Sequence, residues 1–374
     1  MKYYIIAGEA SGDLHGSNLI KELKKLDANA NIRCWGGDKM KDAGGDLVKH
    51  YRDLAFMGFA EVVKNLGTIL QNLKFCKQDI VQFKPDAVIL IDYPGFNLRI
   101  AKWSKQHGIK VIYYISPQVW AWKENRVRQM KEYIDKMIII IPFEKEYFKN
   151  KWNWDVEYVG HPLAQVVESE KLNPDRYREK SERFSDKGII ALLPGSRKQE
   201  IAKKLPVMLE VSRFFPEYQF IVGEAPSVED EFYQQFTKSY SNVSAVKNQT
   251  YDLLMQARAA LVTSGTATLE TALFDVPQVV CYRGSAISYE IAKRVIKVKY
   301  IAMVNLIMDK PVVKELIQKE LTVDNLKHEL HELLTNESRI AQIKKDYAEL
   351  KRILSEGGDA SAKAAKSIIQ FLSK

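Results

Sequence analysis

The feature that most constrains this chain is a regular alternation of short apolar runs, rich in β-branched and aromatic residues, with longer segments of helical periodicity. Such runs are typical of buried parallel strands, and the segments between them are typical of crossover helices. The predicted strands of the first half are Tyr3–Ala7, Ala87–Ile91, Val111–Ile115 and Met137–Ile141. The pattern begins again at Ile189–Leu193, Gln219–Val222, Ala259–Thr263 and Val279–Tyr282. The sequence therefore predicts an α/β protein with two parallel sheets.

A polar, highly charged stretch at 168–187 separates the two series of strands. This stretch, or the Gly160-His161-Pro162 turn just before it, is the predicted junction between two domains. A chain of 374 residues, of which 46% are hydrophobic, is long enough to build both. From Asn325 onward the sequence is helical and charged, with an interruption at Gly357-Gly358.

Net charge and cysteine content limit the partners and the compartment. The formal charge of +9 favours an anionic partner, and leaves nucleic acid, a phosphorylated metabolite and an acidic membrane face open. The three cysteines are widely spaced, so they indicate neither a disulfide framework nor a zinc site and favour a reduced cytosolic setting. The longest apolar runs are strand-sized, and we therefore expect a protein that is neither exported nor membrane-spanning.

Three loops of the first half follow predicted strands, where ligands of open parallel sheets bind. The first loop is Gly8–Asp13, whose glycines allow backbone to approach a ligand and whose amides can hold an anion. An ordinary strand-to-helix turn, with Asp13 near the helix cap, is the equal alternative. The pattern is not Gly-x-Gly-x-x-Gly, which disfavours a dinucleotide site. The candidate residues of this loop are Gly8, Glu9, Ser11, Gly12 and Asp13.

The second and third loops bring a carboxylate and indoles to the same edge. Asp92 directly ends a strand, and a partly desolvated carboxylate there can accept a proton near neutral pH. The alternative role for Asp92 is to organise the turn at Pro94-Gly95. In the third loop, Gln118 and Trp120 lie within 116–122, where aromatic rings can line a sugar or lipid pocket or simply pack in the core.

Two loops of the second half have the composition of phosphate cradles. Leu193–Arg197 offers backbone amides and a guanidinium group, and Thr263–Thr268 offers hydroxyls and amides at a helix start. Glu270, one turn into that helix, can reach ribose hydroxyls. The hydroxyl residues could instead be helix caps, but two cradles in one domain favour a nucleotide diphosphate.

Several other chemistries find no support in the sequence. It contains no Walker motif, no Asp-x-Asp metal motif and no Gly-x-Ser-x-Gly elbow. His328 and His331 are three residues apart rather than the four of a zinc-binding helix, so we interpret them as part of a solvated helix face.

A set of motifs, taken in order along nearly the whole chain, strongly resembles the lipid-A-disaccharide synthase family. Most of these motifs are weak individually, and their shared order carries the resemblance. They are Gly8–Asp13, Phe56-Met57-Gly58, Asp92–Asn97, Ser116–Trp122, Pro142-Phe143-Glu144, Gly160-His161-Pro162, Leu193–Arg197, Ser264–Glu270 and Val313–Leu316.

The resemblance implies a GT-B glycosyltransferase fold, in which two Rossmann-like domains with parallel sheets face each other across a cleft. It implies an acceptor-binding domain at 1–165, a UDP-sugar-binding domain at 166–349 and a C-terminal helix, about 350–374, that returns to the first domain. The implied reaction joins UDP-2,3-diacylglucosamine to 2,3-diacylglucosamine 1-phosphate (lipid X). Its products are the β-1,6-linked lipid A disaccharide 1-phosphate and UDP, and inversion in one displacement requires a base but no covalent nucleophile.

The resemblance also implies roles for single residues. Asp92 is the expected general base, and Arg197 with the amides of 264–268 is expected to stabilise the departing diphosphate without metal or other cofactor. Glu270 is expected to hold the ribose. Met57 belongs to the expected acceptor side of the cleft. The expected UDP and donor residues are Arg197, Ser264, Gly265, Thr266, Ala267, Thr268, Glu270, Asn305, Glu315 and Gln318.

Acylated substrates imply that the enzyme is cytoplasmic and binds the inner membrane of a Gram-negative bacterium peripherally. Apolar residues with interspersed lysines at 56–73, including Val62, Val63, Leu66 and Leu73, form either an interfacial patch or an ordinary core helix. The resemblance is compatible with a homodimer.

Two rivals come from other functional classes. A UDP-N-acetylglucosamine 2-epimerase would share the fold and the nucleotide site but would need further acid and base residues. A nucleic-acid-binding protein is disfavoured, because the Lys and Arg residues are spread along the chain and no nucleic-acid-binding motif is visible. We therefore expect no nucleic-acid partner.

Overall fold

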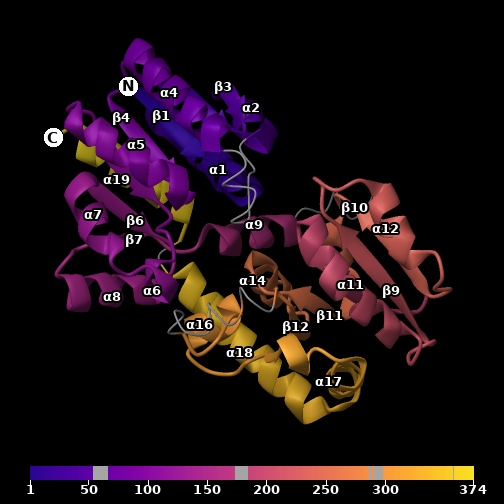
Figure 1. The fold of residues 1–374 in the computed structure, drawn as a ribbon. Helices are drawn as coiled ribbons and strands as arrows, with labels where there is room; N and C mark the ends of the chain where they lie inside the picture. Colours follow the sequence, from indigo (N-terminus) through magenta and orange to yellow (C-terminus); the bar gives the residue numbers. More distant parts are fainter. Residues whose placement is uncertain (54–65, 173–183, 286–288, 290–297, 357) are drawn as a thin grey trace. The chain divides into compact units, whose positions relative to one another are not determined.

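The strands form two separate sheets in this computed structural model, and every strand pair in the described ranges is parallel (Figure 1). The structure describes residues 1–53, 66–172, 184–285, 289, 298–356 and 358–374. Two compact units are present, one comprising 1–162 and 355–374 and the other 163–354. The predicted α/β architecture with two parallel sheets is confirmed.

The first unit has seven strands in the order β3-β2-β1-β4-β5-β6-β7. The strands are β1 (Lys2–Ala7), β2 (Asn31–Gly36), β3 (Asp46–His50), β4 (Ala87–Ile91), β5 (Lys110–Tyr114), β6 (Lys136–Ile139) and β7 (Glu157–Tyr158). The helices are α1 (Ala10–Leu26), α2 (Asp38–Asp42), the 3-10 turn η1 (Tyr51–Asp53), α4 (Leu66–Phe83), α5 (Pro94–Gln106), α6 (Val119–Trp122), α7 (Arg126–Tyr133), α8 (Pro142–Trp152) and α19 (Ala360–Leu372). The last helix of the chain, α19, lies against α1.

The second unit has six strands in the order β10-β9-β8-β11-β12-β13. The strands are β8 (Gly188–Leu193), β9 (Tyr218–Glu224), β10 (Val243–Lys247), β11 (Ala257–Thr263), β12 (Gln278–Tyr282) and β13 (Lys314–Ile317). The helices are α9 (Pro162–Lys171), α11 (Lys198–Ser212), α12 (Asp230–Thr237), α13 (Thr250–Gln256), α14 (Thr266–Leu273), α16 (Met303–Met308), the turn η2 (Gln318–Glu320), α17 (Val323–Thr335) and α18 (Glu337–Ser355).

The strand order determines where the loops after β1, β4, β8 and β11 lie. In each sheet the order reverses at one pair of central strands, β1 and β4 in the first unit and β8 and β11 in the second. Loops that leave such a pair diverge to opposite faces and open a crevice at the carboxyl edge of the sheet. The loops after β1 and β4 contain Glu9 and Asp92, and those after β8 and β11 contain Arg197 and Ser264.

A buried polar network attaches α4 to the first sheet. Asp79, on α4, accepts hydrogen bonds from the Tyr4 hydroxyl at 2.7 Å and from Arg33 Nε and Nη2 at 2.9 and 2.8 Å. The Trp35 indole in turn donates to the Tyr4 hydroxyl at 2.7 Å. Because these groups lie between strands and helix, each needs its partner to offset desolvation.

We expect Asp79→Ala to lower the free energy of unfolding by about 2–4 kcal/mol, since it leaves the buried Tyr4 hydroxyl without its acceptor and removes the buried partner of Arg33. Urea denaturation measures the change. Asp46→Ala is the matched control, because Asp46 pairs with the same Arg33 at 3.0 Å but is exposed. Its loss should cost less than about 1 kcal/mol, and equal losses for both variants would contradict the assigned role of the buried network.

Candidate functional site

Asp92 is held in a constrained backbone at the end of β4. Asp92 and Tyr93 have φ values of 44° and 49°, in the left-handed region that residues with side chains rarely occupy. The carbonyl oxygen of Asp92 accepts the Tyr113 hydroxyl at 2.6 Å and the Asn97 amide at 2.8 Å. Surrounding hydrogen bonds thus maintain a conformation that costs energy, which is a recurrent property of functional sites.

The surroundings of Asp92 raise its affinity for a proton. Burial and, to a smaller extent, the nearby Glu9 carboxylate raise the pKa of Asp92 to about 7, although a hydrogen bond from the Tyr93 amide lowers it. A carboxyl group with a pKa near 7 is about half ionised near neutral pH, and its ionised form is basic enough to act as a general base.

The loop after β1 approaches the Asp92 loop closely. A Cβ atom on Gly8 would lie 2.3 Å from the Tyr93 ring, so only glycine fits at this position. Gly12 is buried against Ala7, where a Cβ atom would lie 3.0 Å from the Ala7 Cβ. Glu9 is half-buried and Ser11 is exposed. Four of the five predicted residues of this loop therefore lie beside Asp92 or at the adjacent helix start.

Asp13, the fifth residue of that loop, is engaged within the fold. Its carboxylate accepts hydrogen bonds from the amides of Gly37, Met40 and Lys39 at 2.7, 3.0 and 3.2 Å. These amides belong to the first turn of α2, whose start lacks internal acceptors. Asp13 therefore caps the start of α2 and not the start of its own helix, α1.

The loop after β5 brings Trp120 to the same edge of the first sheet. The Trp120 indole donates to Glu144 Oε1 at 2.9 Å, while its ring is half-buried, and Gln118 is exposed. Ile115 precedes this loop with a φ of 69°, an unusual conformation for a β-branched residue. Glu144 was not among the predicted site residues. The sequence signals for Glu144 were its place in the Pro142-Phe143-Glu144 motif and in the first turn of a helix that starts with proline, but neither signal assigned it a role.

Two helix starts lie at the carboxyl ends of the central strands of the second unit. α11 follows Arg197, and α14 follows Gly265, whose φ of 141° suits glycine. In the described residues no side chain caps either start, so their first-turn amides face the loop region as an anion cradle would require. Thr266 is exposed, and Ala267 is half-buried.

Arg197 lies at the start of α11 beside an acidic residue of the same helix. Its guanidinium group pairs with Glu200 at 3.3 Å and is about half exposed. Glu200 also lies 4.0 Å from the buried ammonium group of Lys204. Two cations and one carboxylate leave a net positive charge at this loop, and such a charge suits phosphate oxygens.

Two hydroxyl residues of the second cradle support its backbone. Ser264 Oγ donates to the Ile301 carbonyl at 2.8 Å, and Thr268 Oγ1 donates to the Gly265 carbonyl at 2.8 Å. Glu270 accepts the Tyr251 hydroxyl at 2.9 Å, and burial raises the pKa of Glu270. A ribose contact by Glu270 stays a prediction.

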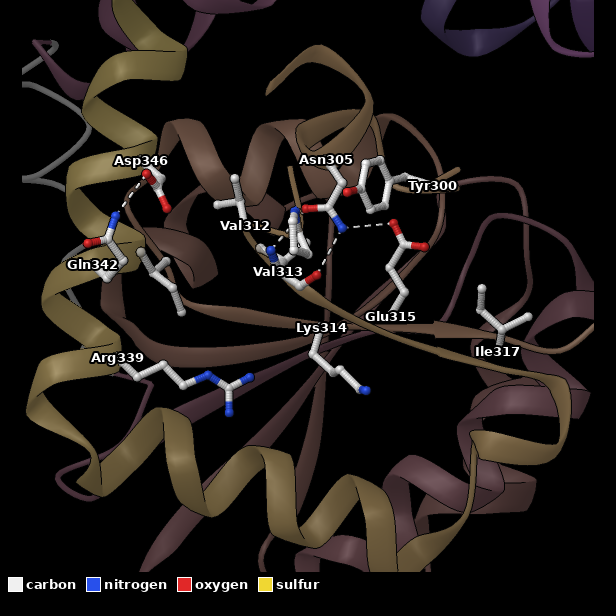
Figure 2. A pocket seen from close by; sticks show the side chains of 12 residues that line it. Tyr300, Asn305, Val312, Val313, Lys314, Glu315, Ile317, Arg339, Gln342 and Asp346 are labelled. Carbon is white, nitrogen blue, oxygen red and sulfur yellow. Dashed lines mark hydrogen bonds between the residues drawn. The ribbon is translucent and has the colours of Figure 1, made fainter. Parts of the chain in front are cut away.

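Asn305 forms a hydrogen bond with Glu315 of β13, and both residues line a pocket of about 420 Å³ (Figure 2). The Asn305 amide donates to the Val313 carbonyl and to Glu315 Oε1, both at 2.9 Å. Glu315 also accepts the amides of Ile301 and Ala302, at 3.1 and 2.9 Å. Because the Ile301 carbonyl accepts a hydrogen bond from Ser264 Oγ, this network is connected to the loop after β11 and supports it.

Gln318 begins the turn after β13 with a φ of 54°. Its side-chain nitrogen is buried and has no hydrogen-bond partner in the described parts of the chain. The remaining predicted residue, Met57, lies outside the described residues. Within those residues no group of three His, Cys, Asp or Glu side chains is placed to hold a metal ion.

Comparison with solved structures defines the class of fold. UDP-GlcNAc 2-epimerase from Neisseria meningitidis, bound to UDP-GlcNAc, matches with a TM-score of 0.70 at 14% identity, over 99% of this chain and 100% of that chain. The calicheamicin glycosyltransferase CalG4 matches with a TM-score of 0.63 at 15% identity, over 100% and 98%. The protein therefore has the GT-B fold that these enzymes share, built from two Rossmann-like units.

Sequence comparison then identifies the family. The family model described as Lipid-A-disaccharide synthetase matches residues 3–370. Lipid-A-disaccharide synthase from Syntrophus aciditrophicus is 39% identical over 97% of this chain and 96% of the relative, and that from Geobacter sulfurreducens is 36% identical over 99% and 97%. The chain belongs to the lipid-A-disaccharide synthase family, a family of glycosyltransferases of lipid A biosynthesis.

The network in Figure 2 yields a test of the second unit. We expect Glu315→Ala to lower the free energy of unfolding by about 2–4 kcal/mol, because two backbone amides and the Asn305 amide lose a charged acceptor. Denaturant titration followed by circular dichroism measures the loss. Lys314→Ala, at the exposed neighbouring position of β13, should change stability by less than about 0.5 kcal/mol. An unchanged midpoint for Glu315→Ala would refute a scaffold role for this carboxylate.

Proposed function

We propose that the protein transfers the 2,3-diacylglucosamine group from its UDP donor to the 6-hydroxyl of 2,3-diacylglucosamine 1-phosphate (lipid X). The products are the β-1,6-linked disaccharide 1-phosphate and UDP. Membership of the lipid-A-disaccharide synthase family supports the reaction class. The observation that carries the chemistry is a half-buried carboxyl group, Asp92, whose pKa of about 7 suits proton abstraction.

The acceptor half of the reaction needs one base. Asp92 takes the proton of the acceptor 6-hydroxyl as its oxygen forms the new bond to the anomeric carbon. The bond from that carbon to the diphosphate oxygen breaks in the same displacement, so an α-linked donor gives a β-linked product. The loop residues Gly8, Glu9, Gln118 and Trp120 are proposed to surround the acceptor sugar.

The donor half of the reaction must stabilise the departing UDP. Arg197 and the amides of 264–268 are proposed to hold the diphosphate oxygens, and the α11 and α14 helix starts contribute their dipoles. Glu270 is proposed to bind the ribose. Arg197, the backbone amides and the two helix starts provide the required positive potential from the chain itself, so the proposal includes neither a metal nor another cofactor.

A peripheral membrane contact is proposed because both sugars carry acyl chains. No helix in the described ranges has the length and apolar character that a membrane span requires. In the described part of the predicted patch, Leu73 is 7% exposed and belongs to the core, whereas Leu70 is 56% exposed. Further along α4, Phe75 is 46% exposed, with the exposed Lys74 between them. Exposed apolar side chains next to lysine on one helix suit an anionic lipid surface.

The membrane contact can be tested with the double variant Leu70→Ser/Phe75→Ser. We expect it to fold normally and to lose at least about half of its recovery on vesicles containing anionic phospholipid, because exposed apolar area drives interfacial binding. Flotation measures the recovery. The control Leu73→Ser should lower the unfolding midpoint instead, since Leu73 is buried. Undiminished flotation of the double variant would remove α4 from the proposal.

The catalytic proposal is tested by Asp92→Asn, which keeps the size of the side chain but cannot accept a proton. With both acylated substrates, we expect kcat to fall about 10²–10⁴-fold while the unfolding midpoint stays or rises. In the unaltered protein, kcat/KM should fall about tenfold per pH unit below pH 7, as Asp92 becomes protonated. Disaccharide formation with unchanged kcat in the variant would exclude Asp92 as the base.

Glu9→Gln gives an independent control on that pH profile. The Glu9 charge raises the pKa of Asp92, so its removal should move the acidic limb to lower pH. If the acidic limb of the kcat/KM profile stays at the same pH in Glu9→Gln, a group other than Asp92 produces that limb. Turnover of UDP-GlcNAc alone, without any acylated acceptor, would instead favour the epimerase reaction that the fold also accommodates.

A further inference from the structure

Three loops with polar side chains leave three neighbouring strands of the first sheet. Asp92 follows β4, Trp120 lies in α6 after β5, and Glu144 lies in the first turn of α8 after β6. These strands are adjacent and parallel, so their carboxyl ends meet at one edge. The Asp92 charge acts on Glu144, which agrees with this proximity.

Glu144 is unusual because its side chain is fully buried and only half satisfied. It is 0% exposed, and Oε1 accepts the Trp120 indole at 2.9 Å. Oε2 is buried without a hydrogen-bond partner in the described residues. An ionised carboxylate in this position would lack the donors that normally offset its desolvation, whereas an un-ionised carboxyl group meets a much smaller penalty.

The Trp120 ring is restrained on two sides by residues of the same helix start. Its indole nitrogen is bonded to Glu144, and its ring meets the Phe143 ring edge-to-face with centroids 4.9 Å apart. A half-buried indole that is restrained in this way presents a fixed apolar surface in the loop next to that of Asp92.

We propose that Glu144 is a positioning residue for the acceptor sugar, whose un-ionised carboxyl group fixes the Trp120 indole beside the Asp92 loop. This inference rests on the proposed function, in which the loop of Trp120 surrounds the acceptor. Glu144 acts through Trp120 and contacts neither substrate. Loss of the restraint weakens acceptor binding and leaves donor binding unchanged.

The protonation state of Glu144 gives the proposal a pH dependence. Burial, with a smaller contribution from the Asp92 charge, raises the pKa of Glu144 to about 8, although interactions with the Trp120 indole and the Ile141 backbone lower it. Tyr147, on α8, also interacts with Glu144, and the Tyr147 hydroxyl donates to Glu124. Because ionisation places a second negative charge near Asp92, we expect the Trp120 site to change above about pH 8.

The kinetic test compares Glu144→Gln, Glu144→Ala and Trp120→Phe in the full-length protein. We expect Glu144→Ala and Trp120→Phe each to raise KM for lipid X about tenfold, the usual effect of one lost buried hydrogen bond. The double variant Glu144→Ala/Trp120→Phe should be no worse than the more impaired single variant, because both remove the same contact. Glu144→Gln, which keeps the acceptor oxygen, should restore KM to within about threefold. Additive losses, or a rise in donor KM alone, would overturn the proposal.

A spectroscopic test does not depend on turnover. The difference in tryptophan fluorescence between the unaltered protein and Trp120→Phe isolates the Trp120 signal. This signal should titrate near pH 8 when Glu144 is present and stay constant in Glu144→Gln. A Trp120 signal that titrates equally in Glu144→Gln would reject Glu144 as the responsible group, even if Glu144→Ala fails to fold. If the titration is seen but no disaccharide forms, the assigned reaction fails while the restraint by Glu144 stands.

Discussion

The chemistry of this protein depends on the reversal of strand order at the centre of each parallel sheet. Between β1 and β4, and again between β8 and β11, the crossover helices leave to opposite faces, and the loops at the carboxyl edge separate. Asp92 and Glu9 therefore come from the two sides of one reversal, and Arg197 and Ser264 from the two sides of the other. Side chains far apart in sequence become neighbours because a parallel sheet brings all its carboxyl ends to one edge.

The number of hydrogen-bond donors around a carboxyl group separates scaffold from chemistry in both units. Asp79 and Asp13 each accept three hydrogen bonds from distant parts of the chain, and Glu315 accepts backbone amides together with the Asn305 side chain. Carboxylates with this many hydrogen-bond donors connect helices and strands to one another. Asp92 and Glu144 have few donors, and burial raises the pKa of both. A buried carboxyl group with few hydrogen-bond donors has a raised pKa. Near neutral pH it can therefore exchange a proton or stay un-ionised.

The sequence predicted the strands that are apolar throughout, but not those whose burial depends on neighbours. All eight predicted strands are present with their ends shifted by at most two residues. The strands that were missed include β3, β7, β10 and β13, which lie at or near sheet edges and are only partly buried. β2 was missed because Arg33 interrupts its apolar run, and only the structure shows that Arg33 pairs with Asp79. Asp92 could be predicted as a site residue from its place at a strand end, whereas the contact of Glu144 with Trp120 joins two different loops and is seen only in the structure.

The return of α19 to α1 has a consequence for how the chain is made. The first unit consists of residues 1–162 and 355–374, so the ribosome delivers its last helix only after the entire second unit. Until then the surface of α1 that α19 covers stays exposed, whereas the second unit already has all of its residues. A chain truncated before α19 would therefore contain every residue of the second unit but would lack one helix of the first.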